Sequence, residues 1–122
     1  MKNILSTLFV ILFAISVSAQ ETASKDNYEY FVVLYTIGEN WDTTRQAHEQ
    51  LYFKEHSLHL SELRRSEKIS IGGRYSDKGM IIVKAKNEGE AKNLVAKDEA
   101  IQNKIFKAEI FPFKPFYNGC IE

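Results

Sequence analysis

The hydrophobic pattern of this chain predicts an α+β fold with the ferredoxin-like order β-α-β-β-α-β, in which a four-stranded antiparallel sheet carries two helices on one face. Three observations lead to this prediction. Four segments are rich in β-branched and aromatic residues, as strands are. Two other segments place apolar residues at helical spacing. The second and third strand segments are joined directly by a short turn that contains glycine.

The first strand is predicted over residues 28–37 (YEYFVVLYTI), after a polar and flexible lead-in over residues 20–27. Apolar side chains occupy both alternating sets of positions in this strand. A strand of this kind is usually covered on both faces, so we expect cover on each side of it. Residues 38–42 follow as a loop.

A single long helix is predicted over residues 43–67, which contain no Gly or Pro and provide about six turns. Thr43 and Gln46 have the spacing of a capping box at its start. At roughly 100° per residue, one stripe of this helix holds all three histidines of the chain among apolar residues. Titratable groups inside an apolar face indicate a functional site. The stripe consists of His48, Tyr52, His56, His59 and Leu63.

The second strand is predicted over residues 68–75, where Gly72 and Gly73 indicate a bulge or a close approach of backbones. Residues 76–79 form a hairpin turn, and residues 80–85 return as the third strand.

The second helix is predicted to begin after Asn87, a capping residue that is followed three positions later by Glu90, and to run to about Lys97. Residues 98–104 form a short polar segment or one more helical turn, and residues 105–113 form the last strand. The buried side of the second helix is expected to consist of Ala91, Leu94 and Val95.

The first 19 residues have the features of a secretory signal peptide, with Lys2 before an apolar run over 4–17 and small residues up to Ala19, the predicted cleavage point. The run is shorter than the roughly 20 residues that a membrane-spanning helix needs. We therefore expect a secreted or periplasmic protein without stable membrane insertion after cleavage. A retained anchor is the alternative.

Residues 28–117 are predicted to form one small domain, followed by a tail over 118–122. The 16 Lys and Arg residues balance 16 Asp and Glu residues, so no charge excess points to nucleic acid. Cys120 is the single cysteine and cannot form an internal disulfide. It is expected to be a free thiol, with an intermolecular disulfide as the alternative.

The aromatic content predicts a homodimer. Two helices cover only one face of a four-stranded sheet, and a domain this small cannot bury all of its aromatic side chains alone. Sheet-to-sheet packing against a second copy would cover them. The side chains concerned, besides the first strand, are Phe106, Phe111, Phe113, Phe116 and Tyr117.

Six short motifs follow one another along the chain, and their order and spacing resemble those of the YCII-related proteins over roughly residues 28–116. The motifs are residues 56–63 (HSLHLSEL), Gly72-Gly73-Arg74, Asp77-Lys78-Gly79, Glu90-Ala91, Asp98-Glu99 and Pro112-Phe113.

This resemblance implies a dimeric α+β barrel and a His–Asp pair, His56 and Asp98, in a pocket between helix and sheet. Some YCII-related proteins eliminate chloride from chlorinated hydroxyquinols without a cofactor, and isomerases of the muconolactone type share the barrel. The chain departs from the family pattern at three positions. Glu99 replaces the proline after Asp98, Arg74 replaces the proline after the glycines, and His59 replaces a tyrosine.

An enzyme of this kind would use His56 as general acid or base, because imidazole transfers protons near neutral pH. Asp98 would hold the imidazole tautomer and stabilise the imidazolium. The expected reaction is a cofactor-independent elimination or isomerisation of a small organic molecule. Hydrogen-bond donors or an anion site for the substrate would come from Tyr52, His59, Gly72, Gly73 and Arg74.

Two other interpretations remain. The His56–Asp98 pair is equally compatible with a purely structural role, in a periplasmic protein that binds a small ligand or has an accessory function without catalysis. His56 and His59 are also close enough on a helix to share a metal ion, for which the third ligand would have to be Asp98, Glu55 or a group from the partner subunit. No HExxH or CxxC motif is present, so no metal is expected. A pair that opens onto a pocket would favour the enzyme.

Overall fold

A computed structural model describes residues 27–117 and 119. The predicted signal peptide, the lead-in up to residue 26 and Cys120 lie outside the described residues. Within the described part, no helix is both long and apolar enough to cross a membrane.

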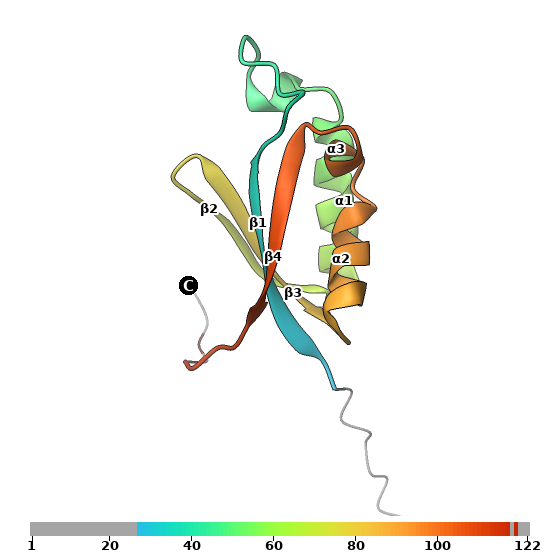
Figure 1. Cartoon of the computed structure of the whole chain (residues 1–122), viewed down its shortest axis with the longest axis vertical. Helices are drawn as coiled ribbons and strands as arrows, with labels where there is room; N and C mark the ends of the chain where they lie inside the picture. The colour runs from blue at the N-terminus through green and yellow to red at the C-terminus, as the bar shows by residue number, and fades with distance from the viewer. Residues whose placement is uncertain (1–26, 118, 120–122) are drawn as a thin grey trace, which may run out of the picture.

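The described residues form a four-stranded sheet with all helices on one side (Figure 1). The strand order is β2-β3-β1-β4, and each neighbouring pair is antiparallel. The predicted α+β fold with a ferredoxin-like arrangement is confirmed. The elements are β1 (Glu29–Ile37), the 3-10 turn η1 (Ala47–Glu49), α1 (Phe53–Arg65), β2 (Ile69–Tyr75), β3 (Lys78–Ala85), α2 (Glu88–Ala96), α3 (Glu99–Gln102) and β4 (Phe106–Phe113).

The core lies between the sheet and the helices. Every second residue of β1 faces the helices and is buried, namely Phe31, Val33 and Tyr35. Register places Phe31 opposite Val83 and Val33 opposite Ile81 on β3. Each large apolar side chain buried in this way contributes about 1.5–3 kcal/mol, so the central strand pair anchors the domain. Ala91 and Val95 of α2 are buried in the same core, as predicted, and Leu94 packs against it.

The opposite face of the sheet remains open. Tyr30 and Phe113 are paired across β1 and β4 and are 39% and 38% exposed, and Phe111 is 47% exposed. Ile71 and Tyr75 of β2 add further exposed apolar area. The predicted cover on both faces of the first strand is thus present only on its helix side within the described chain.

The prediction of one helix over 43–67 is wrong. Gln50 is buried, and its side chain accepts a hydrogen bond from the Asp42 backbone N–H at 2.9 Å and donates one to the Asp42 carbonyl at 2.6 Å. Tyr52 then has a left-handed backbone with φ 63°, which no continuous α-helix contains. The helix α1 therefore begins only at Phe53, and residues 43–52 form a loop around η1.

The predicted capping box at Thr43 is also wrong. Asp42 organises this part of the loop, because its Oδ1 atom accepts hydrogen bonds from the backbone N–H and the hydroxyl of Thr44. A box forms three residues later, where Glu49 Oε2 accepts from the Gln46 backbone N–H at 2.9 Å. As a result, His48 lies exposed on η1 and does not share a helical face with His56.

The second half of the chain follows the predictions closely. The side chain of Asn87 accepts a hydrogen bond from the Glu90 backbone N–H at 2.8 Å and caps α2. A bulge interrupts the register between Ile69 and Ile71, directly before the two glycines. The short polar segment after α2 forms the single helical turn α3.

Candidate functional site

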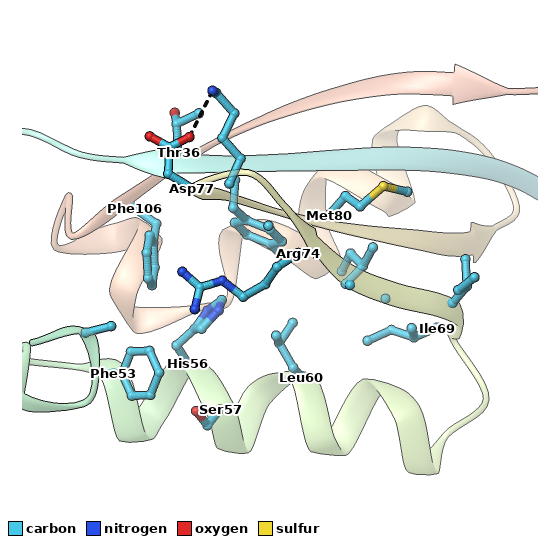
Figure 2. Close-up of a pocket in the computed structure, with 18 of the residues that line it drawn as sticks. Thr36, Phe53, His56, Ser57, Leu60, Ile69, Arg74, Asp77, Met80 and Phe106 are labelled. Carbon is cyan, nitrogen blue, oxygen red and sulfur yellow. Dashed lines mark hydrogen bonds and ion pairs between the residues drawn. The ribbon is translucent and has the colours of Figure 1, made fainter. Parts of the chain in front are cut away.

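A cavity of about 870 Å³ lies between α1 and the sheet near the β2–β3 hairpin (Figure 2). The helix lines it with a stripe of side chains three or four positions apart, as one face of a helix requires. The opposite wall comes from β2, and Trp41 and Phe106 also contribute. The helical stripe consists of Phe53, His56, Ser57, Leu60, Ser61 and Arg64.

His56 connects this cavity to the interior of the domain. Its Nδ1 atom lies 2.5 Å from Oδ2 of Asp98, within hydrogen-bonding distance. The Asp98 side chain is fully buried, whereas the His56 side chain retains 11% of its exposure and lines the cavity. The two residues predicted to form a pair therefore meet, and the imidazole is the member that reaches the cavity.

Asp98 is held by its position at the start of α3. Its second carboxylate oxygen, Oδ1, accepts a hydrogen bond from the backbone N–H of Ala100 at 3.0 Å. Its carbonyl oxygen accepts from the N–H groups of Ile101 and Gln102. The helical turn thus forms with Glu99 in place of proline, and the carboxylate stays aimed at His56.

These contacts determine the orientation and tautomer of His56. In the neutral imidazole, the Nδ1–H group donates to the Asp98 carboxylate, so the lone pair lies on Nε2. Among the described residues, no group forms a hydrogen bond with Nε2. The ring is packed by Phe106, Tyr35 and Phe53, with centroids 4.8, 5.4 and 6.4 Å away. An imidazole held in this way can accept or return a proton at Nε2.

Tyr35 is a polar member of this region that the sequence did not single out. Its hydroxyl oxygen is buried and has no hydrogen-bond partner within the described part of the chain. Burial, and secondarily the negative charge of Asp98, raise the pKa of Tyr35 far above its ordinary value, so the phenol stays neutral. In the sequence Tyr35 is one aromatic residue in an apolar strand, and no local pattern separates it from Tyr30.

The other predicted site residues divide into two groups. Gly72, Gly73 and Arg74 line the cavity from β2. Tyr52 and His59 are not among the residues that line it. Tyr52 occupies the left-handed position before α1. The Nε2 atom of His59 lies 2.8 Å from the Leu94 carbonyl oxygen, so this ring links α1 to α2.

A metal ion would need several donor side chains close together. Over the residues that the structure describes, no group of three or more His, Cys, Asp or Glu side chains is placed to hold one. His56 and His59 make separate hydrogen bonds, to Asp98 and to Leu94.

The fold and the site define a class, namely a ferredoxin-like α+β domain with a buried His–Asp pair at the wall of a cavity. No protein-family model matches the chain, and no curated protein is significantly similar to it.

Proposed function

We propose that this protein is a cofactor-independent lyase or isomerase that acts on a small organic molecule through His56 and Asp98. The observation that carries the proposal is the 2.5 Å contact between His56 Nδ1 and Asp98 Oδ2, with the imidazole at the cavity wall. A base oriented by a buried carboxylate and facing a cavity is the arrangement that general acid–base catalysis uses.

In the proposed reaction, His56 Nε2 takes a proton from a carbon atom next to a carbonyl or another electron-withdrawing group. The electron pair of the broken C–H bond passes into the substrate. It then either forms an enolate that is reprotonated by His56 at another carbon, or expels a leaving group that departs with its own electron pair. Asp98 stabilises the imidazolium formed in the first step, because its charge lies directly at Nδ1.

The size and walls of the cavity support a small substrate. A volume of about 870 Å³ falls within the roughly 300–1,000 Å³ of small-molecule sites. Aromatic rings surround His56 and limit the access of water, which strengthens electrostatic interactions at the reacting atoms. The motif order resembles that of YCII-related proteins, and this resemblance supports the same reaction class. The proposal includes a relationship to that family. It also includes export of the protein, directed by residues 1–19 as a signal peptide.

A non-catalytic ligand-binding protein is the second candidate. The low exposure of the His56 side chain, 11%, favours it, because a histidine so enclosed also serves as a structural partner for a buried carboxylate. The same cavity would then bind its ligand without proton transfer.

Proton NMR titration of the three histidines, in the wild type and in Asp98→Asn, tests the proposal. In the enzyme, His56 titrates, and the substitution moves its midpoint to lower pH, since the imidazolium loses its counter-charge. His48 and His59 serve as internal controls and keep their midpoints. Small phenols and lactones are then screened in deuterated water for hydrogen exchange that His56→Asn abolishes.

Two results would contradict the enzyme. Either His56 does not titrate, or its midpoint ignores Asp98→Asn. Both would leave a core histidine and favour the ligand-binding protein.

We also propose that a second copy of the chain covers the open face of the sheet. Support comes from the exposed aromatic and aliphatic side chains of the strands, together with the face of the sheet that carries no helix (Figure 1). Tyr30 pairs with Phe113, and Val32 pairs with Phe111, across β1 and β4. These side chains are therefore neighbours on the same face of the sheet. Exposed apolar area of this kind is typical of an interface between protein chains.

A further inference from the structure

The cavity is lined by more positive than negative side chains. Arg64, Arg74 and Lys78 contribute cationic groups, and Asp77 is the single carboxylate among the lining residues. Lys78 Nζ lies 3.1 Å from Asp77 Oδ1, so these two charges are paired with each other. The net positive charge of the cavity wall therefore comes from Arg64 and Arg74.

Arg74 is the arginine placed to meet a ligand near His56. Its side chain extends from β2 into the cavity, on the side where His56 rises from α1 (Figure 2). Among residues 27–117, neither Arg74 nor Arg64 takes part in an ion pair or a side-chain hydrogen bond. The guanidinium of Arg74 is therefore available to an anion from outside the chain.

Most of the remaining lining is apolar. Aromatic and aliphatic side chains come from both the helix and the sheet, whereas Asp98 lies behind His56 and does not line the cavity. A ligand must therefore combine an anionic group with an apolar body. The apolar lining consists mainly of Trp41, Phe53, Leu60, Ile69, Met80 and Phe106.

We infer that the cavity binds a small organic carboxylate with a flat apolar body, whose carboxylate pairs with Arg74 and whose body lies among the aromatic side chains beside His56. A guanidinium matches a carboxylate with two parallel hydrogen bonds, and the one guanidinium that lies beside His56 suits a monoanion. This inference deepens the proposed function, since such an acid would be the substrate on which His56 acts.

Benzoate and its neutral isostere benzamide are suitable probes. Trp41 is the only tryptophan of the chain and lines the cavity, so its fluorescence reports binding directly. We expect benzoate to bind about tenfold more tightly than benzamide, the effect of one charge-assisted pair at a partly exposed site. The preference should shrink as salt is added, because the pair is screened.

Arg74→Gln should remove the preference for benzoate and leave benzamide binding unchanged. Arg65→Gln is the matched control, since it removes the same charge from the end of α1 at a residue that does not line the cavity. The inference is overturned if benzoate does not bind, if the two probes bind equally, or if both substitutions weaken benzoate binding to the same extent.

His56→Gln separates this inference from the proposed catalysis. Benzoate should still bind to this variant with its preference over benzamide, because Arg74 is intact. If benzoate binding depends on Arg74 but the His56 titration ignores Asp98, the enzyme proposal fails and the carboxylate site stands. If the titration behaves as expected but the two probes bind equally, the carboxylate inference fails and the catalytic pair stands.

Discussion

At the scale of single residues, the hydroxyl of Tyr35 is the least satisfied group beside the site. It is buried next to the His–Asp pair and has no hydrogen-bond partner among the described residues. A buried hydroxyl without a partner destabilises a fold by about 1–3 kcal/mol, because it has lost its hydrogen bonds to water.

Tyr35→Phe removes this hydroxyl while keeping the ring that packs on His56 and Phe106. We expect the free energy of unfolding, measured with urea at pH 7, to rise by about 1 kcal/mol. Tyr30→Phe is the control, because Tyr30 lies on the same strand but is 39% exposed, and its change should be near zero.

The difference between wild type and Tyr35→Phe should also depend on pH. The folded-state pKa of Tyr35 is raised above the ordinary 10.0, chiefly by burial. The stability that a neutral Tyr35 provides is therefore fully present below pH 10 and is lost as the pH rises above 10. The advantage of the variant should widen over that alkaline range. A variant less stable than wild type at pH 7 would contradict this account of the hydroxyl.

At the scale of elements, Gly38 lies where the end of β1 meets the segment just before β4. Its backbone N–H donates to the Ile105 carbonyl at 2.8 Å, and Asn40 donates to the Lys104 carbonyl at 2.9 Å. A Cβ atom at Gly38 would lie 2.2 Å from the Lys104 carbonyl oxygen, which is part of the backbone and cannot turn aside. Glycine is required here because two backbone segments of the chain approach each other closely.

Gly38→Ala should therefore destabilise the fold by about 2–3 kcal/mol, the range of severe overpacking, in urea denaturation. Gly73→Ala is the matched control. No atom lies within 4 Å of the Cβ position at Gly73, and its change should stay within about 0.5 kcal/mol of zero or be stabilising. Equal effects of the two substitutions would refute the steric explanation.

At the scale of the whole molecule, the helices cover one face of the sheet and leave the other open (Figure 1). Apolar side chains of the strands remain exposed within the described chain. We expect analytical ultracentrifugation at micromolar concentration to find a dimer. Phe111→Lys should shift it to a monomer, because a lysine on β4 would bury its charge between two sheets.

Leu58→Lys provides the comparison, since Leu58 is also about half exposed but lies on α1, away from the open face. It should leave the dimer intact. A monomeric wild type, or a dimer dissociated by Leu58→Lys instead of Phe111→Lys, would exclude sheet-to-sheet pairing.

The sequence by itself determined the order of the elements and most of their bounds. The β-branched and aromatic content of residues 28–37, the Asn87 cap and the turn before β3 depend on neighbours along the chain, and local backbone preferences decide such features. The His56–Asp98 pairing was anticipated through the resemblance to YCII-related proteins. Local pattern alone does not predict it, because 42 positions separate the two residues.

Only the tertiary structure decided the interruption of the long helix and the membership of the site. Gln50 turns back to Asp42, so contacts across the loop outweigh the helical preference of residues 43–52. The same folding directs His59 to Leu94 and encloses Tyr35 beside Asp98. The physical reason is that a side chain's direction and burial depend on what packs against it from distant parts of the chain, whereas strand alternation and helix capping are set within a few residues.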